Sequence, residues 1–233
     1  GLNVMRSQMI RQYGLGDFQF SQSYSFFYDQ LEKSNLFLQA VIDNAKKPMS
    51  DQLNDWLFKN PLSDGGTFCG VIDVVSKYGL VPADVMPESY NANNTSRMAN
   101  ILSLKLREYG LTLRKLSAAG KKSTELEKQK LQMLGTIYHI LTICLGEPVQ
   151  HFTYTLRDAS GKALGETKTF TPQEFYKEYV GNDLKQTYVM VMNDPSRPYH
   201  KTYTIDMDRH SYDGLQWTYL NLPMEEIKPL AIA

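Results

Sequence analysis

Apolar residues recur at intervals of three and four through the first 80 positions, which is the pattern of amphipathic helices. Leu2, Met5 and Met9 share one face of a first helix, which Gly14 is expected to end. More helices follow before position 80. Their expected limits are Ser21 and Pro48 for a long helix, Asp51 and Asn60 for a short one, and Phe68 and Gly79 for the last.

A second helical region lies between about positions 91 and 146, where the chain is rich in Leu, Lys and Glu. Two apolar stripes flank a polar, glycine-bearing linker at 118–122. They consist of Leu102, Leu106, Tyr109, Leu113 and Leu116, and of Met133, Ile137, Ile140 and Cys144. Two helices joined by a short turn should pack antiparallel. The pattern therefore predicts a helical hairpin, either as a subdomain or as an insertion.

The last third of the chain changes to an alternation with a period of two, which favours strands. One strand is expected before a turn at 158–162, one at 188–192 that should be buried on both faces, and one near Ile205. Their residues are Phe152, Tyr154 and Leu156, the run Tyr188–Met192, and Tyr203, Ile205 and Met207. A capping box at 171–174 predicts a helix, and another should follow Pro223.

Composition limits the class of protein. The 233 residues, 42% of them hydrophobic, provide for one large domain or two smaller ones. With 25 basic and 25 acidic residues, the net charge of +0 gives no field that attracts nucleic acid or anionic lipid. No stretch approaches the roughly 20 apolar residues of a membrane span. Cys69 and Cys144 are too few for a disulfide framework, so a cytoplasmic setting is expected, although an exported form stays open because the sequence begins without Met.

Few residues have the spacing of metal or nucleophile sites. His139, His151, His200 and His210 lack the HxxxH spacing of a helical zinc site, and there is no CxxC, so no metal or other cofactor is predicted. Cys69 follows a diglycine loop at the start of a helix, where the helix dipole favours a thiolate. A small apolar residue that packs the first turn is the preferred interpretation of Cys69, because nothing in the sequence places a histidine beside it.

The loop from Asn60 to Gly66 is the most informative segment. The adjacent glycines Gly65 and Gly66 uncover the backbone, so another backbone can approach closely or a positive φ can be adopted. The loop is either a simple turn ahead of a helix or a ledge whose N–H and C=O groups pair with an extended peptide. If the loop is a ledge, Asp64, Gly65 and Gly66 would bind the substrate.

Ordered motifs extend this hypothesis to nearly the whole chain. They are Leu2–Arg6, Phe20–Tyr24, Asn60–Gly66, Lys77–Pro82, Met86–Tyr90, Cys144–Pro148, Thr171–Tyr176 and Asn193–Pro195. In this order the segments resemble the bleomycin hydrolase and bacterial aminopeptidase C family of papain-like cysteine peptidases. In that family the counterpart of Leu2–Arg6 follows the catalytic Cys-Trp pair within a few residues, and the next motifs read FSQ-Y, NP–DGG, KYG–VP and PES. So many motifs in one order are far more specific than a lone glycine pattern.

The resemblance implies an α+β, papain-like fold. Residues 1–90 would be part of the helical domain, residues 91–146 a helical-hairpin insertion, and residues 147–233 the start of the β-rich domain. The family's enzymes are cysteine aminopeptidases, in which a thiolate formed by proton transfer to imidazole attacks the scissile carbonyl and releases N-terminal residues from peptides.

The resemblance also places the catalytic residues outside the chain. The nucleophilic cysteine is expected about five residues before Gly1, and the catalytic histidine with its orienting asparagine is expected after Ala233. None of the four histidines falls in that later motif. The sequence is therefore expected to be an internal piece of a longer enzyme, to contain no catalytic residue, and to be inactive alone.

The family further implies a peptide substrate and a barrel-like homohexamer with inward-facing active sites. The hairpin at 91–146 is the candidate oligomer contact, with ordinary intramolecular packing as the alternative. Two other functions stay open on the residues themselves. One is a non-enzymatic assembly or peptide-binding module that uses the hairpin, and the other is a small thiol enzyme that uses Cys69.

Overall fold

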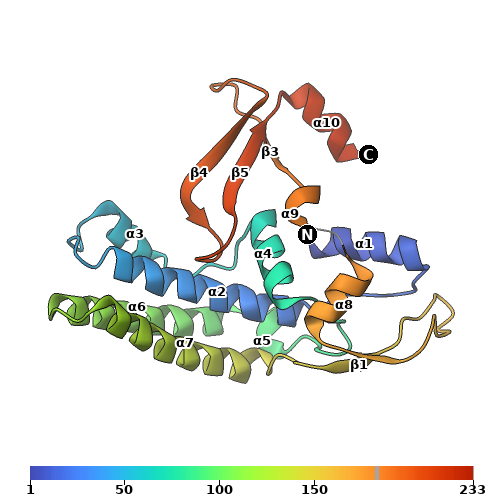
Figure 1. The fold of residues 1–233 in the computed structure, drawn as a ribbon, viewed down its shortest axis with the longest axis horizontal. Helices are drawn as coiled ribbons and strands as arrows, with labels where there is room; N and C mark the ends of the chain where they lie inside the picture. Colours follow the sequence, from blue (N-terminus) through green and yellow to red (C-terminus); the bar gives the residue numbers. More distant parts are fainter. Residues whose placement is uncertain (182–183, 233) are drawn as a thin grey trace.

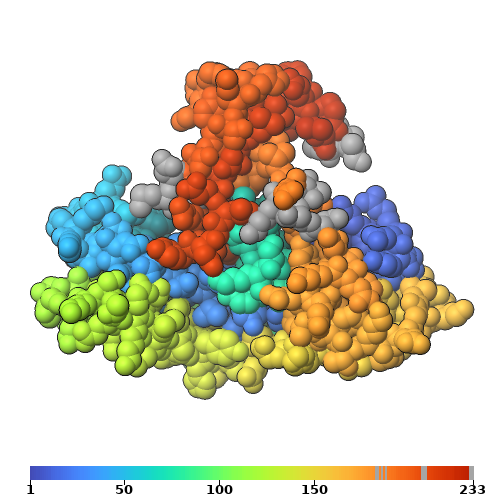
Figure 2. All heavy atoms as spheres, in the orientation of Figure 1, coloured from blue at the N-terminus to red at the C-terminus, as the bar shows by residue number. Residues whose placement is uncertain are grey.

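The structure, a computed structural model, describes residues 1–181 and 184–232, except for the side chains at 185, 187, 206–208, 231 and 232. Helices form a broad body, and a sheet stands above it with a helix at its side (Figure 1). Figure 2 shows the same division as a strand lobe that projects from the helical body. The helices of the body are α1 (Leu2–Tyr13), α2 (Gln22–Asp43), α3 (Gln52–Lys59), α4 (Phe68–Tyr78), α5 (Tyr90–Asn93), α6 (Ser96–Ala118) and α7 (Ser123–Leu145).

The ends of the early helices follow from local capping chemistry, and the predicted limits are confirmed except that α2 ends at Asp43 and not at Pro48. Ser21 Oγ accepts a hydrogen bond from the N–H of Tyr24 at 3.0 Å and begins α2. Asp51 does the same at the start of α3. Gly14 ends α1 with φ 64°, in the left-handed region that glycine adopts at no steric cost. The first third of the chain therefore forms helices where its sequence predicts them.

Helix α2 is the centre of the body. It packs against α4 and against the α6–α7 hairpin, which lies along its other side (Figure 1). The predicted stripe of α6 is confirmed, because Leu102, Leu106 and Leu113 are fully buried. On α7 the predicted stripe is correct at Met133 and Ile137, but beyond Ile137 the buried positions differ from the predicted ones.

The buried side of α7 continues through Leu141 and Leu145, whereas Ile140 and Cys144 are only half-buried. Each step of four exceeds a full turn by about 40°, so the buried stripe drifts around α7 from Ile137 onward, whereas the predicted alternation of four and three would have kept it on one face. The inward face of the hairpin is therefore part of the core of the body.

The strands form two separate sheets. β1 (Phe152–Tyr154) and β2 (Lys168–Phe170) make an antiparallel ribbon beside α8 (Pro172–Tyr179), which Thr171 and Glu174 begin with a reciprocal capping box. The lobe contains a sheet in the order β3-β5-β4, with β3 parallel and β4 antiparallel to β5. The remaining elements are α9 (Leu184–Thr187), β3 (Met190–Met192), β4 (Lys201–Arg209), β5 (Gln216–Asn221) and α10 (Met224–Ile232).

The strand predictions are only partly correct. The run at 188–192 pairs only through β3, and Val189 and Val191 are 64% and 36% exposed, so the expectation of burial on both faces is wrong. The reason is that β3 lies at an edge of the described sheet and not between two strands. β4 is present as predicted, but Ile205 is exposed, and the side chain of Met207 lies outside the described residues. Among the helices in the described ranges, none combines the length and apolar character that crossing a bilayer requires.

Candidate functional site

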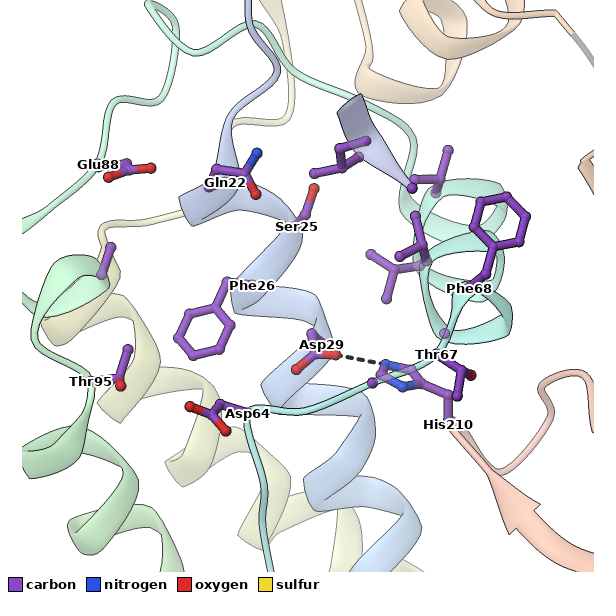
Figure 3. A pocket seen from close by; sticks show the side chains of 18 residues that line it. Gln22, Ser25, Phe26, Asp29, Asp64, Thr67, Phe68, Glu88, Thr95 and His210 are labelled. Carbon is purple, nitrogen blue, oxygen red and sulfur yellow. Dashed lines mark ion pairs between the residues drawn. The ribbon is translucent and has the colours of Figure 1, made fainter. Parts of the chain in front are cut away.

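A cavity of about 530 Å³ lies among the helices of the body and is lined on one side by His210 (Figure 3). Gly1 and Leu2 at the start of α1 line it together with Asp64 and Gly66 from the loop before α4. His210 reaches it from the segment that follows β4 (Figure 3). Its remaining walls come mainly from the first turns of α2 and the valines of α4, so the cavity has both polar and apolar sides. The beginning of α1 and the loop of the substrate-binding hypothesis therefore meet at one cavity.

The two glycines of the loop are not required by the fold of the described chain. Neither Gly65 nor Gly66 has a positive φ. A Cβ added at Gly65 would meet nothing within 4 Å, and one added at Gly66 would meet His210 Cε1 only at 3.9 Å. Of the two reasons that the sequence offered for glycine, the special backbone conformation is thus wrong. What remains is an uncovered stretch of backbone that another chain can approach.

The side chain of Lys33 binds this loop from the side of α2. Its Nζ donates to the carbonyl oxygens of Ser63 at 3.0 Å and Gly65 at 2.6 Å, and to Oδ2 of Asp29 at 2.9 Å. An ammonium group has three donors, so these contacts use all of them. Gln30 adds a second donor to the oxygen of Ser63 at 3.1 Å. The loop conformation is therefore fixed by side chains of α2.

Asp29 joins the loop to the strand lobe, because its Oδ1 lies 2.9 Å from Nε2 of His210 (Figure 3). The imidazole is 3% exposed and packs on the backbone of Gly70, where an added Cβ would lie 2.4 Å from Nδ1. Burial acts to raise the pKa of Asp29, but the close contact with His210 and the charge of Lys33 outweigh burial and lower the pKa overall. The carboxylate of Asp29 is thus kept ionised by His210 and Lys33, and Gln30 Nε2 donates a further hydrogen bond to Oδ2 at 2.8 Å.

The other histidines stand apart from the cavity. His139, His151 and His200 are exposed, and His200 faces Glu226 at 3.4 Å. His139 lies off the buried face of α7, although its neighbour Ile140 is half-buried. Across the described residues, no group of three or more His, Cys, Asp or Glu side chains is arranged to hold a metal ion.

Cys69 lies where a small apolar residue that packs the first turn of a helix is expected. It lies in the first turn of α4 and is 7% exposed, with Sγ 3.7 Å from Sδ of Met190. Burial raises the pKa of its thiol, and the nearby charge of Asp73 raises it further. A nucleophilic cysteine needs a lowered pKa, so these surroundings favour the role of a small core residue.

The fold defines the class of protein. The structure resembles that of PepW from Lactobacillus rhamnosis HN001 with a TM-score of 0.93 and 36% sequence identity. The match covers 99% of this chain and 52% of that one. The architecture, mostly helical with small sheets, is therefore the papain-like fold of the C1 peptidases.

The family model of the Peptidase C1-like family matches residues 1–233, and the chain belongs to this family. It is 38% identical over 233 residues to aminopeptidase C of Lactobacillus delbrueckii subsp. lactis, across 99% of this chain and 51% of that protein. It is 36% identical over 238 residues to bleomycin hydrolase of Homo sapiens, across 100% of this chain and 52% of that protein. The chain thus spans about half the length of the curated relatives it matches, and the resemblance seen in its motifs is confirmed.

Proposed function

We propose that this chain is part of a cysteine aminopeptidase that acts on peptides, and that Asp64, Gly65 and Gly66 form one wall of its substrate cleft. The observation that carries the proposal is the shared cavity, which brings Gly1 and Leu2 at the start of α1 together with Asp64 and Gly66. In the proposed enzyme the nucleophilic cysteine precedes Gly1, so α1 carries the thiol toward the loop. The catalytic histidine and asparagine follow Ala233, and the chain by itself is inactive.

The role of this chain is to bind the peptide, and the chemical step belongs to the thiolate and imidazole. Apart from the Gly65 carbonyl that Lys33 binds, the backbone groups at Gly65 and Gly66 can pair with the backbone of an extended peptide, as an added strand pairs with a sheet edge. Such pairing reads the substrate main chain and tolerates many side chains. This agrees with glycines that nothing inside the described chain requires.

Activity of the protein expressed from its complete coding sequence tests the catalytic class. Aminoacyl-coumarin substrates are assayed before and after treatment with a thiol alkylator. Hydrolysis that alkylation abolishes is the expected result. Hydrolysis that survives alkylation, or that depends on zinc, would refute the cysteine mechanism.

The substitution Gly66→Ala tests the substrate wall. Because an added Cβ has room, we expect folding stability to change by less than about 0.5 kcal/mol. The KM for peptides should rise, since the methyl group would hold a substrate backbone away from the ledge. Gly135→Ala is the matched control, because Gly135 also has open space but lies on α7 away from the cavity. Equal KM values for Gly66→Ala and wild type would remove residues 64–66 from the site.

The proposed enzyme is a homo-oligomer, with a hexamer as the form that the family resemblance implies. Support comes from the outer face of the α6–α7 hairpin, where Leu104, Leu131 and Ile143 are each about two-thirds exposed. Replacing Leu104 and Leu131 by Glu should reduce the mass measured by sedimentation, and an unchanged assembly would place the contact elsewhere.

A further inference from the structure

The loop that forms the proposed substrate wall is held by a chain of contacts that begins in the strand lobe. His210 contacts Asp29, Asp29 contacts Lys33, and Lys33 binds the carbonyl oxygens of the loop. The Asp29–Lys33 pair has the i,i+4 spacing of a helix, and the other contacts connect α2 to the segment after β4 and to the loop before α4.

The contact between Lys33 and Gly65 determines which way the Gly65–Gly66 peptide group faces. A trans peptide group is planar, so the N–H of Gly66 points opposite to the C=O of Gly65. Because Lys33 Nζ binds that carbonyl at 2.6 Å from the side of α2, the N–H of Gly66 is turned away from α2. The orientation of a peptide-binding group therefore depends on a side chain that lies outside the loop.

Burial makes this arrangement specific. The side chain of Lys33 is 12% exposed and that of Asp29 is 20% exposed, so the pair is less screened by solvent than a surface pair. His210 closes the end of the network against Gly70, a position where a side chain would collide with the imidazole.

We infer that Lys33, Asp29 and His210 are positioning residues that orient the Gly65–Gly66 peptide group for substrate binding. Lys33 acts directly on the loop, Asp29 fixes Lys33, and His210 fixes Asp29 from the strand lobe. This inference rests on the proposed function, because it assigns to these residues the geometry of the same substrate wall.

Kinetics of Lys33→Met in the protein expressed from its complete coding sequence test the inference. The KM for an alanine tetrapeptide should rise about tenfold, as expected for the loss of about 1.4 kcal/mol of binding, while kcat stays within about twofold. The KM for a single-residue aminoacyl-coumarin should rise less, because that substrate offers fewer backbone groups to the wall. Lys121→Met, which removes an exposed ion pair with Glu125, is the matched control and should leave both values unchanged.

The conservative variant of His210 separates positioning from folding. His210→Ala should raise the KM for the tetrapeptide. His210→Gln should bring the KM most of the way back to the wild-type value, because the glutamine amide can donate to Asp29. Hydrogen exchange of peptides spanning 60–67 should accelerate in Lys33→Met and His210→Ala but not in Lys121→Met.

The outcomes distinguish the two proposals. Wild-type protein without alkylation-sensitive activity would defeat the proposed function, and the exchange measurement would still test whether Lys33 and His210 hold the loop. If the wild type is active, either of two results for Lys33→Met would overturn the inference. One is a KM for the tetrapeptide equal to that of the wild type, and the other is a lower kcat at an unchanged KM. If Lys33→Met does not fold, the comparison of His210→Ala with His210→Gln decides, and equal KM values in the two variants overturn the inference.

Discussion

Both carboxylate oxygens of Asp73 lie 3.1 Å from the backbone nitrogen of Leu215, so α4 accepts a hydrogen bond from the segment that leads into β5. This contact joins the helical body to the strand lobe next to His210. Asp73 is buried, so Asp73→Ala should destabilise the chain by about 1–3 kcal/mol in urea unfolding, because the N–H of Leu215 loses a buried acceptor. Asp55→Ala removes only an exposed ion pair with Lys59 and should cost less than about 1 kcal/mol. Equal losses would mean that Asp73 does not hold the lobe.

The lowered pKa of Asp29 predicts a specific loss of stability in acid. A carboxyl group whose pKa is lower in the folded than in the unfolded state stabilises the fold above its unfolded value of about 4, and this contribution disappears as the pH falls through the folded pKa. Asp29→Asn should therefore be less stable than wild type at pH 6. The difference should shrink in unfolding experiments at progressively lower pH, and a constant difference would contradict the ion-pair account.

Two glycines on helices should respond to alanine in opposite directions. At Gly70 the new Cβ would lie 2.4–2.9 Å from atoms of the His210 ring, and overpacking of this kind typically costs about 1–3 kcal/mol. At Gly135, on the exposed side of α7, the new methyl group meets nothing within 4 Å, and removing a helical glycine should stabilise the chain by about 0.5–1 kcal/mol. Melting temperatures of the two variants provide the check, and a stable Gly70→Ala would show that His210 is not packed there.

Asn221 should be the most sensitive asparagine of the strand lobe. It is fully buried, its Nδ2 donates to the carbonyl oxygens of Asp194, Arg197 and Pro198, and its Oδ1 accepts from the N–H of Asp194. Asn221→Ala would leave several of these groups unpaired, so we expect a loss of at least about 2 kcal/mol. Asn94→Ala removes one exposed bond to Tyr90 and should change stability by less than about 0.5 kcal/mol in the same denaturation experiment.

Cys69 should be dispensable for catalysis and slow to react. Its buried thiol has a raised pKa, so alkylation in the native state should be much slower than that of a free cysteine. Cys69→Ala should leave the turnover of the complete protein unchanged. Loss of turnover without loss of folding would revive the hypothesis of a thiol enzyme that uses this residue.

The sequence predicted the helical body well because its signals are local. Capping at Ser21 and Asp51, the left-handed glycine at Gly14, and the stripe through Leu106 each depend on residues within one or two turns. The Asn60–Gly66 loop could be singled out for the same reason, since adjacent glycines are visible without any tertiary information.

Properties that depend on distant segments could not be predicted in the same way. The position of β3 at the edge of a sheet is set by its pairing with β5, so an apolar run alone suggested more burial than the structure gives. The contacts of His210 with Asp29 and of Lys33 with Gly65 join segments far apart in the chain, and composition or periodicity cannot reveal them. The cavity is therefore known from the structure, although the loop that borders it was known from the sequence.

The absence of any steric demand at Gly65 and Gly66 has a consequence for mutational libraries. A selection that scores only expression or thermal resistance would accept alanine and other small residues at both positions, because neither φ nor packing opposes them. A selection that scores peptide turnover would reject the same residues. The two positions therefore offer an internal marker that separates variants defective in recognition from variants defective in folding.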